Sequence, residues 1–201
     1  SEKKGIEKET KHVEELNPRK ILVYDLKKRT CTYIERKFFA LVPEINKNIL
    51  QDLRKILEEA VRIRMPEKNF GLLFSGGIDS LLLAKIIKDF GYDCTCYTAA
   101  TSEDAPDLLS AKDAAKKLGL KLKYKTVTRE ETETYLRKIV PLIEDNNVVK
   151  VGVALPLYIA SELAREDGNK VIFSGGGADE LFGGYHRYKT TNDAKKLNND
   201  C

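Results

Sequence analysis

The chain has 201 residues, of which 42% are hydrophobic and 33% charged, and this balance excludes both a disordered chain and a membrane protein. Its formal net charge of +4 comes from 35 basic and 31 acidic residues interspersed along the chain, which gives no electrostatic support for nucleic-acid binding. No apolar run approaches the roughly 20 residues of a membrane span, and the charged start lacks the apolar stretch of a secretory signal, so we expect a cytoplasmic protein.

Two β-rich runs open the chain. Residues 21–26 (ILVYDL) and 30–34 (TCTYI) are separated by Lys-Lys-Arg, which predicts a β-hairpin. Apolar residues then recur at helical spacing over 45–61, which predicts an amphipathic helix leading into the main domain. We therefore expect an N-terminal extension with a hairpin over residues 1–45 and one larger domain over residues 46–201.

A unit of apolar strand, helix and closing glycine recurs from residue 70 onward. Gly91, Gly119 and Gly168 each follow a helical segment and suit the left-handed residue that closes a helix. The predicted strands are 70–74, 93–99, 121–127 and 170–173. The third strand alternates lysine with apolar residues, which favours a sheet edge, whereas the first is apolar on both faces and belongs in the middle. The sequence therefore predicts a layered α/β domain with helices on both faces of a parallel sheet of order 3-2-1-4, and a site where strands 1 and 4 end.

The loop between the first strand and its helix is residues 75–80, SGGIDS. Its glycines let backbone amides approach a phosphate, the hydroxyls of Ser75 and Ser80 add donors, and the helix start contributes a positive dipole end. The loop lacks the lysine of GxxxxGK[ST] and the spacing of GxGxxG. A glycine pair between a strand and a helix is also ordinary tight-turn chemistry, so this motif alone leaves a phosphate site and a simple turn both open.

Carboxylates favour the phosphate site. Asp79 inside a phosphate cradle is repulsive unless a divalent cation lies between them, and magnesium is the candidate. The second loop, SGGGADELFGGYHRY from Ser174, follows the fourth strand and offers Asp179 and Glu180, although acidic residues in a first helical turn also complement the helix dipole. Because both strand-end loops combine glycines, a serine and an aspartate, we predict Asp79 and Asp179 as magnesium ligands of one site.

Both loops resemble those of a known family. SGGIDS at 75–80 resembles the pyrophosphatase loop (PP-loop) of the N-type ATP pyrophosphatases, and SGGGADELFGGY from Ser174 resembles the second signature of the synthetase domain of glutamine-dependent asparagine synthetases and their β-lactam-forming relatives. Residues 104–119 and 151–167 are similar to the segments between these signatures, so the resemblance covers about residues 46–190. It implies the adenine-nucleotide α-hydrolase-like fold of PP-loop proteins.

The resemblance also implies a carbon–nitrogen ligase of the kind used in amino-acid biosynthesis. A substrate carboxylate attacks the α-phosphorus of ATP, an acyl-adenylate forms, pyrophosphate leaves, and ammonia or an amine then displaces AMP. ATP, Mg²⁺ and a small carboxylate are the implied ligands. By position, Phe74 and Ala100 would line the adenine side, and Ser174 and Gly175 would contact the nucleotide. The implied nucleotide-binding set is Phe74, Ser75, Gly76, Gly77, Asp79, Ser80, Ala100, Ser174 and Gly175.

Three departures from the family shape the expected activity. Gly176 stands where the family has a glutamate that acts in acyl transfer, so another acceptor or another acid has to be considered. About 45 residues precede the ATP domain, where a glutamine-hydrolysing synthetase carries a whole amidotransferase domain, so we expect free ammonia, a substrate amine or a separate glutaminase subunit to supply nitrogen. The family's adenylate-steadying lysine lies in a region beyond Tyr188, where Lys189, Lys195 and Lys196 read as solvated surface charges. His186 and Arg187 are candidate phosphate contacts or ordinary surface residues.

Two alternative functions stay open. The chain could be a nucleotide-binding subunit of a larger complex without complete synthetase chemistry, or a PP-loop enzyme that modifies transfer RNA. The second alternative would call for CxxC pairs or an RNA-binding module, and the sequence has neither. Its four cysteines match no zinc-binding spacing, and Cys94 and Cys96 fall on one face of a predicted strand.

Overall fold

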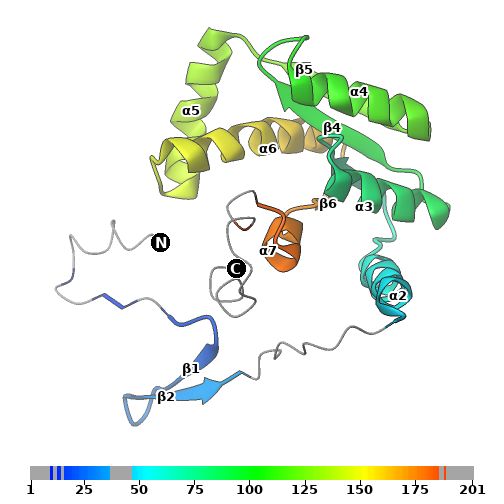
Figure 1. Cartoon of the computed structure of the whole chain (residues 1–201). Coiled ribbons are helices and arrows are strands. Elements are labelled where there is room, and N and C mark those ends of the chain that lie inside the picture. Colours follow the sequence, from blue (N-terminus) through cyan, green and yellow to red (C-terminus); the bar gives the residue numbers. More distant parts are fainter. Residues whose placement is uncertain (1–9, 11–12, 15, 37–46, 186–187, 189–201) are drawn as a thin grey trace. The chain divides into compact units, whose positions relative to one another are not determined.

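Strands and helices alternate through most of the chain, as Figure 1 shows for the computed structural model. The residues that the structure describes are 10, 13–14, 16–36, 47–185 and 188. The chain divides into two compact units, Ser1–Leu53 and Arg54–Cys201, and each is described by itself. The domain boundary predicted at residues 45 and 46 lies outside the described residues.

The first unit contains the predicted hairpin. Strand β1 (Lys20–Asp25) pairs antiparallel with β2 (Thr30–Glu35), and Ile21 is opposite Ile34. Ile21, Leu22 and Val23 are consecutive apolar residues of β1, and neighbouring residues of a strand point to opposite sides. The hairpin therefore carries apolar side chains on both faces. The predicted amphipathic helix is observed as α2 (Ile49–Arg62), and the boundary between the two units falls within it, after Leu53.

The second unit is an α/β domain. Its elements in chain order are β3 (Gly71–Leu73), α3 (Ile78–Asp89), β4 (Thr95–Ala100), α4 (Pro106–Leu118), β5 (Lys121–Thr126), α5 (Arg129–Ile143), α6 (Val148–Glu166), β6 (Ile172–Phe173) and α7 (Ala178–Phe182). The four strands are parallel in the order β5-β4-β3-β6, which confirms the predicted order 3-2-1-4 and places the lysine-rich strand at an edge. The loops after β3 and β6 therefore leave the sheet from the same edge, on neighbouring strands.

Helices lie on both faces of the sheet, as predicted (Figure 1). Alternating side chains of β3 and β4 pack against them. On one face, Leu72 and Cys96 belong to a core cluster with residues of α3 and α4. On the other, Leu73 and Tyr97 pack with Ala160 of α6. Right-handed crossovers explain this distribution. The units β3-α3-β4 and β4-α4-β5 run in one direction along the sheet, which places α3 and α4 on one face. The connection from β5 back to β6 runs in the opposite direction, which places α6 on the other face.

The predictions made for individual glycines and cysteines of this unit agree with the structure. Gly91, Gly119 and Gly168, which were predicted to close helices, have φ values of 79°, 61° and 81°. Cys94 and Cys96 are buried in the same core cluster, which confirms that they share one face. The hydrogen bond between their side chains, together with burial, raises the pKa of the Cys96 thiol, so this thiol stays protonated.

Two helices connect β5 to β6, and the sequence analysis anticipated only the second. Helix α5 begins at a capping box, in which the Glu131 N–H donates to Thr128 Oγ1 at 3.2 Å and the Thr128 N–H donates to Glu131 Oε2 at 2.9 Å. Helix α6 begins at Asn147, whose side chain accepts from the N–H of Val149 at 2.9 Å. None of the described helices is by itself long and apolar enough to cross a membrane; α5 and α6 meet that criterion only together, as a pair bent by 109°.

Candidate functional site

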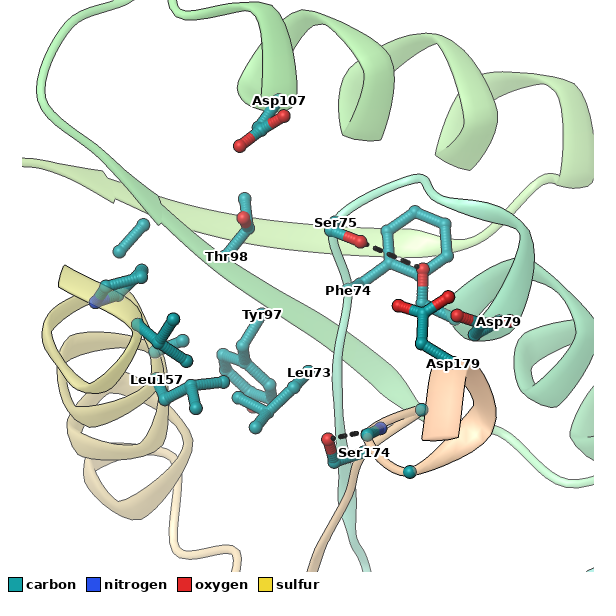
Figure 2. Close-up of a pocket in the computed structure, with 18 of the residues that line it drawn as sticks. Leu73, Phe74, Ser75, Asp79, Tyr97, Thr98, Asp107, Leu157, Ser174 and Asp179 are labelled. Carbon is teal, nitrogen blue, oxygen red and sulfur yellow. Dashed lines mark hydrogen bonds between the residues drawn. The ribbon is translucent and has the colours of Figure 1, made fainter. Parts of the chain in front are cut away.

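A cavity of about 450 Å³ lies where β3, β4 and β6 end, and α6 forms one of its walls (Figure 2). The cavity takes residues from both loops that the sequence analysis singled out. The predicted site residues that line it are Phe74, Ser75, Asp79, Ser80, Ser174, Gly175 and Asp179. The fold thus brings together two segments that lie about a hundred residues apart in the chain.

The loop after β3 is a turn closed by serine hydroxyls. Ser75 Oγ accepts a hydrogen bond from the Gly77 N–H at 3.3 Å and lies 3.4 Å from Ser80 Oγ, which donates to the Gly77 carbonyl at 3.0 Å. Helix α3 begins directly after Gly77, and no side chain caps it. Since the first N–H groups of a helix have no acceptor within the helix, the amides of residues 78–80 can donate to an anion.

The loop after β6 repeats this turn. Ser174 Oγ accepts a hydrogen bond from the Gly176 N–H at 3.1 Å, as Ser75 does from the glycine two residues later. Gly177 then has a φ of 99° and leads into α7, whose first turn holds Asp179 and Glu180. Each loop therefore presents a serine and an aspartate to the same cavity.

Two glycines let these loops pack closely. A Cβ on Gly175 would lie 3.0 Å from Asp79 Cβ and 3.1 Å from the backbone N of Ser80, so the second loop lies directly against the first turn of α3. Gly76 has a φ of 75°, and a Cβ there would lie 2.7 Å from the backbone N of Ala111. Gly76 was predicted to let the backbone approach a phosphate and Gly175 to contact the nucleotide, and the structure adds a requirement for close backbone packing at both positions.

The two predicted metal ligands line the cavity together. Asp79 extends from the first turn of α3 and Asp179 from the first turn of α7, and Figure 2 shows both on the side of the cavity where Ser75 lies. Among the described residues, no group of three or more His, Cys, Asp or Glu side chains is placed to hold a metal ion. Two carboxylates fit magnesium that is also bound by nucleotide phosphates, because Mg²⁺ in nucleotide sites takes one or two carboxylates and fills its shell with phosphate oxygens and water.

Other predicted residues are placed differently. Phe74 is 2% exposed and packs in the core beneath α3 and α4, although part of it reaches the cavity. Ala100 lines an adjoining cavity of about 220 Å³. Gly76 and Gly77 form the turn beside the larger cavity and are not among its lining residues. His186, Arg187 and the three lysines after Tyr188 lie outside the described residues.

The cavity also contains residues that the sequence analysis did not select. They are Leu73, Tyr97, Thr98, Ala99, Asp107, Val153, Pro156, Leu157, Ala160, Gly177 and Tyr185. Gly176 and Glu180, which the sequence had singled out without a ligand assigned to them, line the cavity as well. Alternation along the strands would have identified three of the strand residues, since Leu73, Tyr97 and Ala99 share one face. The spacing of Val153, Leu157 and Ala160 in a helix indicates one face but not whether that face meets a core or a cavity.

Tyr97 forms part of the cavity floor while its hydroxyl is held elsewhere. The Tyr97 hydroxyl donates to Asp167 Oδ2 at 2.6 Å and accepts from Asn169 Nδ2 at 2.8 Å. Burial, aided by the hydrogen bond to Asp167, raises the pKa of Tyr97 to about 12. Because both partners precede β6, the hydroxyl points to the amino-terminal edge of the sheet and the ring is left to shape the cavity.

The match to a family model and the curated relatives agree on one family. The asparagine synthase family model matches residues 52–199. The chain is 36% identical over 183 residues to a Methanocaldococcus jannaschii protein whose name assigns it to the glutamine-hydrolysing asparagine synthetases, an alignment that covers 88% of this chain and 33% of that protein. It is 29% identical over 170 residues to asparagine synthetase B of Escherichia coli, with 74% of this chain and 29% of that protein covered.

Among solved structures, the NH₃-dependent NAD synthetase of Campylobacter jejuni has a TM-score of 0.46 and 20% identity, and the match covers 69% of this chain and 60% of that one. The chain spans about a third of the length of the curated relatives that it matches.

Proposed function

The chain belongs to the asparagine synthase family, and from this premise we propose that it is an ATP-dependent ligase that activates a substrate carboxylate as an acyl-adenylate and passes the acyl group to ammonia or an amine. One observation carries the proposal. Two matching Ser-Gly-Gly turns, each followed by an aspartate, flank a single cavity at the carboxyl edge of a parallel sheet. Such an edge is the usual place for a nucleotide in an open α/β domain.

The residues of the two loops have complementary roles in this proposal. In this proposal ATP is a substrate, and its phosphates would be bound by the amides at the start of α3 and by the hydroxyls of Ser75 and Ser80. Magnesium held by Asp79 and Asp179 would offset the charge that develops on the departing pyrophosphate. The carboxylate oxygen of the substrate forms a bond to the α-phosphorus, and the bond from the α-phosphorus to the oxygen that bridges to the β-phosphorus breaks.

The nitrogen source is proposed to differ from that of a complete glutamine-hydrolysing enzyme. At Gly176, where the family resemblance implies a glutamate, a Cβ would meet only Ser174 Oγ, at 3.4 Å. Gly176 offers no side chain that can take a proton from an incoming amine or hold the acceptor. We therefore propose that another acid or another acceptor takes the place of the family glutamate. We also propose that free ammonia, an amine or a separate glutaminase subunit supplies the nucleophile, in the cytoplasm where ATP is abundant.

Exchange of labelled pyrophosphate into ATP tests this function. We expect exchange only with a carboxylate and Mg²⁺ present. We expect Asp79→Asn and Asp179→Asn each to lower its rate by about 100-fold or more, since each removes a charged ligand of the proposed magnesium. Asp113→Asn is the matched control, because Asp113 is an exposed aspartate of α4 paired with Lys117 at 2.6 Å, away from the cavity. Its exchange rate should stay near that of the wild type.

Calorimetric titration with ATP, with and without Mg²⁺, separates binding from chemistry. If ATP binds and no carboxylate provokes exchange, the ligase proposal is wrong and the chain is a nucleotide-binding subunit. If exchange survives both asparagine variants unchanged, the two aspartates are not the magnesium ligands.

A further inference from the structure

A short loop, residues 183–185, brings the chain from the end of α7 back to its first turn. Gly183 has a φ of 63°, the left-handed conformation that ends a helix. The Gly184 N–H then donates to the carbonyl of Asp179 at 2.9 Å, and the Tyr185 hydroxyl donates to Oε1 of Glu180. This return loop therefore contacts both acidic residues in the first turn of α7.

Tyr185 anchors the return loop at its far end. Its ring packs edge-on against the ring of Tyr188, with the centroids 5.7 Å apart, and Tyr188 is buried. Tyr185 lines the cavity together with Glu180, whereas Gly184 is not among the lining residues. Any effect of Gly184 on the cavity must therefore act through a neighbour.

That neighbour is the carboxylate of Asp179. A Cβ added to Gly184 would lie 1.9 Å from Asp179 Oδ1, 3.0 Å from its Cγ and 3.2 Å from its Cα. A carbon and an oxygen that are not bonded approach to about 3.3 Å, so the oxygen would have to move by about 1.4 Å. Because Cγ is also too close, rotation about the Cβ–Cγ bond cannot relieve the contact, and the whole carboxyl group must swing about the Cα–Cβ bond. Gly184 thus leaves the space that Asp179 needs in its observed orientation.

The orientation of this carboxylate matters for the role proposed for it. Asp79 and Asp179 line the same side of the cavity (Figure 2). Mg²⁺ demands a nearly ideal octahedral set of ligands, and functional sites tolerate displacements of only about 0.5 Å. A movement of about 1.4 Å by one of the two carboxylates exceeds that tolerance.

We propose that Gly184 is a positioning residue of the magnesium site, because its missing side chain keeps the Asp179 carboxylate turned toward the cavity and Asp79. The inference rests on the function proposed above. The φ of Gly184 is not positive, so the backbone accepts an alanine at this position without strain. The effect of Gly184→Ala therefore comes from its contact with Asp179.

The effect of Mg²⁺ on ATP binding tests the proposal. Calorimetric titrations of the full chain with ATP, in saturating Mg²⁺ and in EDTA, give the factor by which Mg²⁺ tightens binding. We expect Gly184→Ala to reduce this factor by about 10- to 100-fold, which is the usual cost of losing a residue that orients a metal ligand. Leu181→Ala is the matched control, because Leu181 is 72% exposed on the same helix and does not line the cavity. It should keep the wild-type factor.

A second background separates an effect on the ligand from an effect on the fold. Asp179→Ala removes both the proposed ligand and the two side-chain atoms that an alanine at position 184 would meet. In this background, Gly184→Ala should change the magnesium factor by less than about twofold and leave the urea unfolding midpoint nearly unchanged, since residues in contact are not additive.

A wild-type magnesium factor in Gly184→Ala, or an equal loss in both backgrounds, overturns the inference and leaves the ligase function standing. An equal fall of the urea midpoint with and without the Asp179 side chain also overturns it, because Gly184 would then support the fold and not the ligand. If Asp179→Ala by itself leaves the magnesium factor unchanged, the magnesium assignment in the proposed function is wrong, and the inference is wrong with it.

Discussion

A methyl group added to Gly175 should disrupt the site, whereas the same change at Gly176 should not. A Cβ on Gly175 would lie 3.0 Å from Asp79 Cβ and 3.1 Å from both the Asp79 carbonyl carbon and the Ser80 N. Ordinary contacts between such atoms begin near about 3.5 Å, so the shortfall is about 0.5 Å. At Gly176 the nearest atom is Ser174 Oγ at 3.4 Å. Neither glycine has a positive φ, so the comparison isolates packing from backbone strain.

The expected magnitudes follow from these distances. Gly175→Ala must push the loop after β6 away from the first turn of α3, and overpacking of this kind costs about 1 to 3 kcal/mol. Binding sites tolerate displacements of only about 0.5 Å before affinity falls. If the binding free energy of ATP is weakened by the same amount, about 1 to 3 kcal/mol, its Kd should rise by about 5- to 150-fold. Gly176→Ala should leave unfolding unchanged or raise stability by up to about 1 kcal/mol, because alanine restricts the unfolded chain.

Urea unfolding of both variants, together with calorimetric titration of ATP in the presence of Mg²⁺, measures the two quantities. Equal stability and equal Kd for Gly175→Ala and Gly176→Ala would refute the reasoning, because it would mean that the two loops do not lie in contact. A loss of ATP affinity in Gly176→Ala alone would refute it as well, since it would assign the tight backbone approach to the wrong residue.

Three further predictions concern residues around the site. Gly76→Ala combines a left-handed φ with a Cβ 2.7 Å from the backbone of α4, so urea unfolding should show a loss of about 2 to 5 kcal/mol, and a loss below about 1 kcal/mol would argue against that contact. Thr128→Ala removes the capping box of α5 and should cost about 1 kcal/mol, with Thr134→Ala on the same helix as a control that should cost less. Hydrogen bonds from Lys123 and from Tyr97 lower the pKa of Asp167 in the folded protein. The ionised Asp167 therefore stabilises the fold at pH values above the ordinary aspartate pKa of about 4, and this stabilisation is lost as the pH falls through the lowered pKa of the folded state. Asp167→Asn should therefore be less stable than the wild type at pH 7 and show a smaller loss of stability on acidification, and identical urea midpoints across pH 3 to 7 would contradict this.

Much of the fold could be predicted because its signals are local. Lysines on one side of β5 indicated an edge strand, and the apolar run around β3 indicated a central one, so the sheet order followed. Helix α5 was missed although its capping box, Thr128 to Glu131, is visible in the sequence. Charged residues fill its first turns and only Tyr135 and Ile139 of the helix are fully buried, so its apolar periodicity is weak.

The sequence by itself determined the α/β class, the order of the strands and the two Ser-Gly-Gly loops. Motifs, glycines at helix ends and apolar periodicity depend only on residues that are close together in the chain. Only the tertiary structure decided that Gly175 lies against Asp79 and that Gly76 lies against α4, since contacts between distant segments depend on how the sheet and its helices pack. It also decided the character of α6. Val153 and Leu157 have the spacing of ordinary core residues, and only the folded chain shows that they line a cavity together with residues of β3 and β4.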